Sequence, residues 1–240
     1  MKIAILGTRG IPNYYGGFEQ FAEFFSVYLV QKGHEVYCYN SHNHKFQEKN
    51  FHGVNIIHQH DPEYKYGTFG QFIYDYNCII DSRKRDFDII LQLGYTSNSI
   101  WFFLLPKKPI IITNMDGIEW KRSKYSRPVQ QFLRFAERLA AISSHYLVSD
   151  SLGIQMFLKK RYKKDSTYIA YGAHPFNNPN ATKHLALIWL DRSGSVIRIS
   201  LNRTPGFIAQ YILAISSIAT VCSLFVVVPD FLNFFNIRLE

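Results

Sequence analysis

The chain has 240 residues, of which 47% are hydrophobic and 16% are aromatic. This composition argues against a disordered chain, because the apolar residues suffice for the core of one large domain, or of one domain with an appendage. The net charge of +9 lies mostly in residues 1–176 and favours anionic partners such as phosphates or acidic lipid surfaces. No helix-turn-helix, RNA-binding or zinc signature accompanies the charge, so we expect no nucleic-acid partner.

The cysteines and histidines predict neither disulfides nor a metal site. Cys38, Cys78 and Cys222 are odd in number and form no CxxC pair. The two local histidine groups, at 41–44 and 58–61, have loop character and lack metal-ligand spacing. The apolar run at the start is too short for a signal peptide. We therefore expect a reduced, cytoplasmic chain without a metal.

Short runs rich in Ile and Val alternate with segments of helical period as far as Ala170. This pattern is typical of an α/β fold in which helices cover both faces of a parallel sheet, a Rossmann-like doubly wound domain. It predicts about seven strands: Lys2–Leu6, Glu35–Tyr39, Val54–His58, Phe87–Leu93, Pro109–Thr113, Tyr146–Ser149 and Thr167–Ala170. Helices are expected near 18–30, 69–85, 100–105, 128–142 and 152–162. The second helix should bury Phe72, Ile73, Tyr76, Ile79 and Ile80.

The loops that follow the strands are where a ligand should bind. The first loop, Gly7–Glu19, is rich in glycine and leads into a helix N-terminus, which suits an anion. Its glycine spacing is neither GxGxxG nor Walker A. The alternative for this loop is a glycine-bearing connection to a tightly packed helix.

The loop after the fifth of these strands combines acids with cations. Asp116 and Glu119 stand beside Lys121, Arg122 and Lys124. Carboxylates accept hydrogen bonds from sugar hydroxyls or take a proton, and Lys and Arg hold phosphate. The alternative is a helix-entry loop whose charges pair with each other or with water.

Basic runs occur at 83–85, 107–108 and 159–164. They lie at helix ends or turns, so a solvated face explains them without further function. The functional interpretation is attraction to the anionic inner leaflet of a cell membrane, which would suit a lipid-linked acceptor.

Several motifs resemble bacterial glycosyltransferase family 4, especially its rhamnosyltransferase-like branch. They are Gly7–Pro12, Tyr15–Glu19, Gln71–Asp75, Gln92–Tyr95, Asn114–Tyr125, Asp150–Ser151 and Tyr171–Ala173. The resemblance covers Met1 to about Asn178 and implies the N-terminal, acceptor-side domain of a GT-B fold, here residues 1–176. It also implies a retaining enzyme that uses a nucleotide sugar and no metal or other cofactor.

The resemblance assigns roles to particular residues. Gly16, Gly17 and Arg9 would lie at the donor diphosphate and sugar, and Lys121, Arg122 and Tyr95 would bind the acceptor. Asp116 and Glu119 are the catalytic candidates. Retaining transfer requires mainly positioning of the sugars and stabilisation of the leaving diphosphate, so no dedicated nucleophile is expected.

Residues 177–240 depart from the family pattern. A donor-side domain would carry a Glu-x7-Glu motif, but the one glutamate after Phe176 is Glu240. Residues 204–229 carry no charge and are long enough for a transmembrane helix, which we place at 206–228. The tail is expected to be a rearranged, non-family sequence or, alternatively, a membrane anchor; an apolar tail that packs on the sheet or aggregates is the plainest case.

Two functional hypotheses follow. The first is a retaining glycosyltransferase, of rhamnose in this branch, which builds a cell-surface polysaccharide at the inner face of the membrane and is truncated here. The second is an inactive remnant that binds the acceptor, or a membrane-tethered partner protein that lends its acceptor groove to another chain.

Overall fold

The computed structural model describes residues 1–170 and the backbone of residues 187–190 and 196–199. The described residues belong to two units, Met1–Ala170 and Tyr171–Glu240. The first unit is an α/β domain, and the sequence resemblances fall almost entirely within it.

Its sheet has eight strands in the order β3-β4-β2-β1-β5-β6-β7-β8. The parallel strands, all seven of which were predicted, are β1 (Lys2–Leu6), β2 (Glu35–Ser41), β4 (Val54–Gln59), β5 (Ile89–Leu93), β6 (Ile110–Asn114), β7 (Tyr146–Ser149) and β8 (Thr167–Tyr168). Strand β3 (Asn50–Phe51) was not predicted, and it pairs antiparallel with β4. The register places Ile3 of β1 between Val36 and Ile89. Strand order reverses at β1, from which the chain winds outward in both directions, as in other doubly wound sheets.

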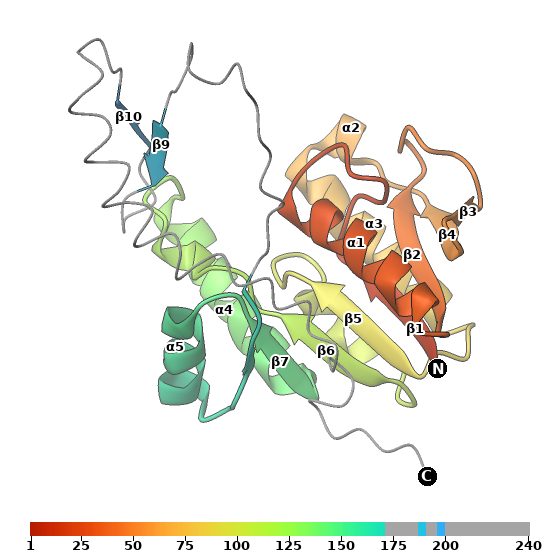
Figure 1. The fold of residues 1–240 in the computed structure, drawn as a ribbon. Helices are drawn as coiled ribbons and strands as arrows, with labels where there is room; N and C mark the ends of the chain where they lie inside the picture. Colours follow the sequence, from red (N-terminus) through yellow and green to blue (C-terminus); the bar gives the residue numbers. More distant parts are fainter. Residues whose placement is uncertain (171–186, 191–195, 200–240) are drawn as a thin grey trace, which may run out of the picture. The chain divides into compact units, whose positions relative to one another are not determined.

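Helices cover both faces of this sheet. They are α1 (Gly17–Gln31), α2 (Glu63–Tyr66), α3 (Thr68–Ser82), α4 (Arg127–Ser143) and α5 (Leu152–Tyr162), with short 3-10 turns at Ser99–Leu104 and Glu119–Lys121. Figure 1 shows α1 on one face of the sheet and α3 on the other. Because parallel crossovers are right-handed, the two directions of winding place helices on opposite faces.

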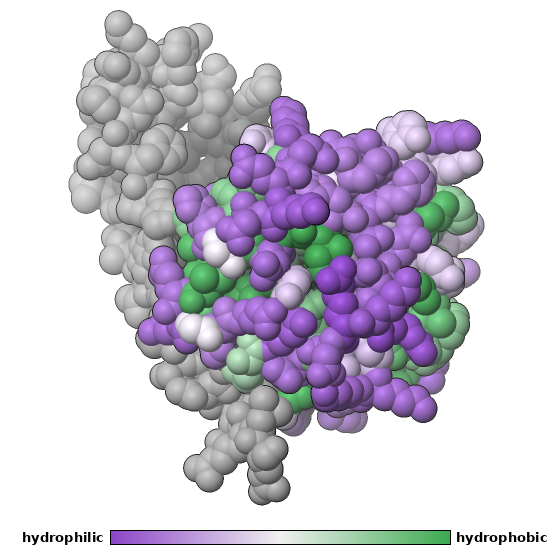
Figure 2. All heavy atoms as spheres, turned by 90° about the vertical axis from the view of Figure 1, so that its right-hand side faces the viewer, coloured by the Kyte–Doolittle hydropathy of each residue, from purple (hydrophilic) through white to green (hydrophobic). Residues whose placement is uncertain are grey.

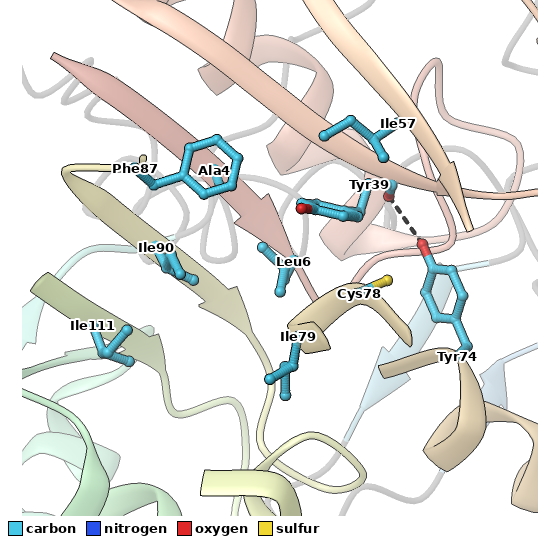
Figure 3. Close-up of a cluster of buried hydrophobic side chains, with 10 residues drawn as sticks. All are labelled: Ala4, Leu6, Tyr39, Ile57, Tyr74, Cys78, Ile79, Phe87, Ile90 and Ile111. Carbon is cyan, nitrogen blue, oxygen red and sulfur yellow. Dashed lines mark hydrogen bonds between the residues drawn. The ribbon is translucent and has the colours of Figure 1, made fainter. Parts of the chain in front are cut away.

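The core cluster on the α3 face explains why this helix docks where it does. Leu6 of β1 and Ile90 of β5 pack with Cys78 and Ile79 of α3 (Figure 3). The hydroxyl of the buried Tyr74 donates a 3.0 Å hydrogen bond to the main-chain oxygen of Tyr39, drawn as a dashed line in the same figure. This bond satisfies a polar atom that burial would otherwise leave unpaired.

The face that α3 buries differs from the predicted one. Of the five residues expected to be buried, Ile79 is in the core, whereas Phe72, Ile73 and Ile80 are half-buried and Tyr76 is exposed. The buried stripe is instead Gly70, Tyr74, Asp75, Cys78, Ile79 and Ser82. The prediction is confirmed for Ile79 and wrong for Tyr76, because it counted only strongly apolar side chains, whereas the stripe that faces the sheet includes a carboxyl group.

The outer surface of the first unit is mainly polar but also exposes large hydrophobic side chains, among them Phe69 and Phe103. On the side that carries β3 and β4, hydrophilic residues predominate and hydrophobic ones lie between them in several smaller areas (Figure 2). The edge of the sheet at β3 is only two residues long, which limits the exposed backbone that another strand could pair with.

The second unit contributes one short antiparallel pair, β9 (Leu187–Leu190) and β10 (Val196–Ile199). Among the described residues, none of the helices is both long and apolar enough to cross a bilayer. The transmembrane helix predicted at 206–228 lies outside the described residues.

Candidate functional site

A cleft of about 430 Å³ opens at the carboxyl edge of the sheet. The loops that follow β1, β4, β5 and β6 form its walls, together with the first turns of α3. These strands point in the same direction, so their following loops meet at one edge (Figure 1). Ligands of doubly wound domains bind at this edge, and the cleft is therefore the candidate site.

The cleft brings together most of the residues predicted from the sequence. Arg9, Tyr95, Asp116, Glu119 and Arg122 all line it, although they come from three separate loops.

Three other predicted residues do not line the cleft. Gly16 and Gly17 are not among its lining residues but stand between two that are, Tyr15 and Phe18. The ammonium group of Lys121 lies 5.6 Å from the centre of the Trp120 ring.

Gly16 and Gly17 are not required by close packing. A Cβ atom added at Gly17 would meet nothing within 4 Å, and one added at Gly16 would meet only a Glu19 carboxylate oxygen, at 3.4 Å. Gly7 is different, because its φ is +84° and an added Cβ would overlap the carbonyl oxygen of Leu93. Close packing therefore explains why residue 7 is a glycine, whereas the open space at Gly17 leaves its backbone accessible to a ligand.

Arg9 is held in place by a network within the cleft wall. Its Nε and Nη2 atoms donate to the two carboxylate oxygens of Glu63, at 2.9 and 2.7 Å. The Tyr15 ring stacks on the guanidinium group, with its centre 3.8 Å from Cζ. Gln71 donates a further 3.0 Å hydrogen bond to Glu63. The bidentate pair fixes both side chains and joins the β1 loop to the start of α2.

The loop after β6 is shaped by its own polar groups. The hydroxyl of Tyr95 donates to the main-chain oxygen of Gly117 at 3.1 Å and accepts from the amide of Glu119 at 3.3 Å. Arg122 Nη2 lies 2.9 Å from Glu119 Oε1. Burial raises the pKa of Glu119, and the charge of Arg122 opposes that rise. Asp116 makes no hydrogen bond or ion pair with another described residue, so its carboxylate is available to a ligand.

A buried carboxylate behind this loop anchors it to the rest of the domain. Glu137 of α4 is 2% exposed and accepts hydrogen bonds from Trp120 Nε1 at 3.0 Å and from the Tyr162 hydroxyl at 2.6 Å. Burial raises the pKa of Glu137, and the two hydrogen bonds oppose that rise. Since these bonds tie the loop to α4 and α5, Glu137 sets the position of the segment that carries Asp116 and Glu119.

Asp75 of α3 is a cleft residue that the sequence prediction missed. It is 6% exposed and accepts a 2.5 Å hydrogen bond from the Ser97 hydroxyl. Burial raises its pKa to about 7, with a smaller contribution from the charge of Asp61, while Ser97 and Arg9 act in the opposite direction. A carboxyl group that changes its charge near neutral pH can both donate and accept hydrogen bonds at the site.

Further missed residues come from the loops after β4 and β5. Asp61, Glu63, Ser97 and Asn98 line the cleft, and none of the four belongs to a motif singled out from the sequence. Asp75 could have been found, since it interrupts an otherwise apolar helical stripe. A charged residue in such a stripe signals a buried functional or paired group.

The histidine groups stabilise loops beside the cleft. His42 Nδ1 accepts the amide of Asp61 at 2.8 Å, and His44 Nδ1 accepts the amide of Phe46 at 3.2 Å. Over residues 1–170, no three His, Cys, Asp or Glu side chains are grouped closely enough to hold a metal ion.

The chemistry of the cleft is that of a polar recognition site. Carboxylates and hydroxyls accept hydrogen bonds from a ligand, and the exposed Tyr15 ring offers an apolar face. Such a combination suits a molecule that has hydroxyl groups and carbon-bound hydrogens on one ring.

Comparison with known proteins identifies one family. Residues 1–174 match the family described as "Domain of unknown function (DUF1972)". A search of curated proteins found no match.

Proposed function

Since the chain belongs to the DUF1972 family, whose description names no activity, we propose a function from the geometry of the site. The first unit is the acceptor-side domain of a retaining glycosyltransferase that uses a nucleotide sugar, and its cleft holds the acceptor sugar. The observation that carries this proposal is the cleft at the carboxyl edge, where Asp116, Glu119, Asp75 and the Tyr15 ring face one space. Aromatic and carboxylate groups together complement the two kinds of surface of a sugar ring.

The two candidate catalytic carboxylates have different roles in this proposal. Asp116 is not engaged by another described residue, so it receives the acceptor hydroxyl and orients it towards the donor. Glu119 is paired with Arg122 and holds the loop in shape. Positioning of this kind accounts for a large part of the barrier reduction when two reactants must meet.

The transferred sugar, the acceptor and the membrane location are proposed from motif resemblance and from charge. The motifs at Gly7–Glu19 and Asn114–Tyr125 support rhamnose as the transferred sugar and a growing cell-surface polysaccharide as the acceptor. A second cavity, of about 400 Å³, brings two of the basic runs together: Arg83, Arg85, Lys107 and Lys108 line it, and so does Asp86, which pairs with Lys108. This grouping supports peripheral binding to an anionic membrane surface on the cytoplasmic side.

A second candidate function is acceptor binding without transfer, as a remnant or as a partner of another chain. The observation that favours it is the composition of residues 177–240, in which the one glutamate is Glu240 and a Glu-x7-Glu motif cannot occur. The same acceptor cleft serves both candidates.

An assay of the full chain separates them. The chain is incubated with nucleotide-linked rhamnose and lipid-linked saccharides, and release of the nucleoside diphosphate and the mass of the product are measured. The proposal predicts transfer that falls by about 10²-fold or more in Asp116→Asn and is unchanged in Asp165→Asn, an exposed carboxylate paired with Lys159. Saccharide binding without transfer supports the second candidate, and the absence of both refutes the two together.

A further inference from the structure

The charged residues of the cleft are unbalanced in a protein that is basic overall. Two arginines, Arg9 and Arg122, face five carboxyl groups, which belong to Asp61, Glu63, Asp75, Asp116 and Glu119. The excess is negative whether Asp75 is ionised or protonated. The net charge of +9 therefore does not describe the ligand-binding surface.

Both arginines already pair with a carboxylate of the protein. The Nε and Nη2 atoms of Arg9 donate hydrogen bonds to Glu63, and the Tyr15 ring covers one face of the guanidinium group. Arg122 lies 2.9 Å from Glu119, so its charge is already compensated. The neighbouring Lys124 is not among the cleft residues, and its ammonium group lies 4.8 Å from the centre of the Tyr125 ring. A phosphate in the cleft would therefore meet two arginines whose charges are already balanced by carboxylates.

Six backbone amides of the glycine-rich loop already have an acceptor within the protein. Anion-binding loops work by pointing unpaired amides at the ligand. Here six amides between residues 9 and 16 donate instead to side chains of the protein: Arg9 to Glu19, Gly10 to Thr8, Ile11 to Asn40, Asn13 to Glu23, and Tyr15 and Gly16 both to Asn13. Two of these acceptors are themselves carboxylates, which further disfavours an anion at this loop.

The cleft does contain hydrogen-bond acceptors that have no donor among the described residues. Asn98 lines it and is 4% exposed, and its Oδ1 atom has no hydrogen-bond partner among the described residues. The carboxylate of Asp116 is likewise not engaged by any of them. A buried acceptor without a partner is costly and needs a donor from a ligand or from water. Sugar hydroxyls are such donors, and a fully ionised phosphate is not.

We propose that the cleft binds an uncharged sugar ring, whose hydroxyls donate to Asn98 and Asp116 while one ring face packs on Tyr15, and that it excludes phosphate groups. This inference rests on the proposed function and specifies its acceptor subsite. The part of the acceptor that enters the cleft is an unphosphorylated sugar, and any phosphate of a lipid carrier or nucleotide lies outside it.

The test compares matched pairs of ligands. Methyl α-glycosides of rhamnose, glucose and N-acetylglucosamine are titrated into the full chain, each beside the 1-phosphate of the same sugar. Dissociation constants are measured by ligand-observed NMR. For every sugar that binds, the phosphate should bind at least about tenfold more weakly, because its charge meets uncompensated carboxylates at short range. Raising the salt concentration from about 0.05 M to about 0.5 M should narrow that difference.

A variant ties the discrimination to the cleft. Asp116→Asn should weaken binding of the neutral sugar and reduce the penalty for the phosphate, while Asp165→Asn should change neither. Tighter binding of the phosphate, with the gain lost in Arg122→Gln, would overturn the inference and leave the sugar site of the proposed function standing. Failure of every neutral sugar to bind would overturn both.

Discussion

Replacing Asp75 with asparagine should stabilise the protein at alkaline pH. The carboxyl group is 6% exposed, and burial raises its pKa from 3.8 to about 7. Between these two values the folded protein retains a proton that the unfolded chain has released. Stability is therefore greatest below the unfolded pKa and is lost as the pH rises towards the folded pKa.

The size of the effect follows from the two pKa values. The free energy of unfolding should fall by about 1.4 kcal/mol for each pH unit between them, which amounts to about 4 kcal/mol by pH 8. Asparagine has nearly the same shape, carries no charge and can still accept the hydrogen bond from Ser97. Asp75→Asn should match the wild type to within about 1 kcal/mol near pH 4 and exceed its stability by up to about 4 kcal/mol at pH 8.

Urea denaturation of both proteins at several pH values measures this difference. Because the comparison is between variants, other groups that titrate in the same range cancel. Asp165→Asn, which removes an exposed carboxylate with 84% of its side chain accessible, serves as the control and should show no such dependence on pH. A stability difference between Asp75→Asn and the wild type that stays constant from pH 4 to pH 8 would refute the argument from burial.

Three further predictions concern the supports of the cleft. Arg9→Lys should lower the free energy of unfolding by about 1 kcal/mol in urea denaturation, because lysine cannot form the two-point contact with Glu63; an unchanged midpoint would contradict this. Glu137→Ala should lower the free energy of unfolding by about 3 kcal/mol and weaken sugar binding, since the Trp120 indole N–H and the Tyr162 hydroxyl lose their buried acceptor. Full sugar binding by a folded variant would show that Glu137 is not needed to position the loop after β6. In thermal unfolding, Gly17→Ala should leave the free energy of unfolding unchanged or raise it by about 0.5 kcal/mol, whereas Gly7→Ala should lower it by about 2 kcal/mol or more. Equal effects of the two substitutions would contradict the conclusion that Gly7 is closely packed and Gly17 is not.

The parallel strands could be predicted because each is a short run rich in apolar or β-branched residues, and most of them lie next to a helix of clear period. Strand β3 could not, since two residues carry no periodic signal and its pairing depends on the neighbouring β4. Asp75 was assigned to no face, because hydrophobic periodicity takes no account of a carboxyl group buried at a functional edge. The residue that was missed therefore lies in the candidate site, where sequences most often depart from the local pattern.

The site itself was partly predictable for a topological reason. Arg9, Tyr95 and Asp116 follow parallel strands, so the fold must bring their loops to one edge. The pairing of Arg9 with Glu63 was not predictable, since 54 residues separate the two and Glu63 belongs to no motif. Only the three-dimensional arrangement reveals that this arginine pairs with Glu63 through two hydrogen bonds, and its role at the donor diphosphate stays a prediction.

Backbone amide NMR of the full chain during titration with the methyl glycosides tests the central claim most directly. If the cleft is the acceptor sugar site, the shift changes should concentrate at residues 7–9, 94–98 and 116–119 and should be lost in Asp116→Asn but retained in Asp165→Asn. Shift changes confined to other surfaces, or identical in the two variants, would contradict the account.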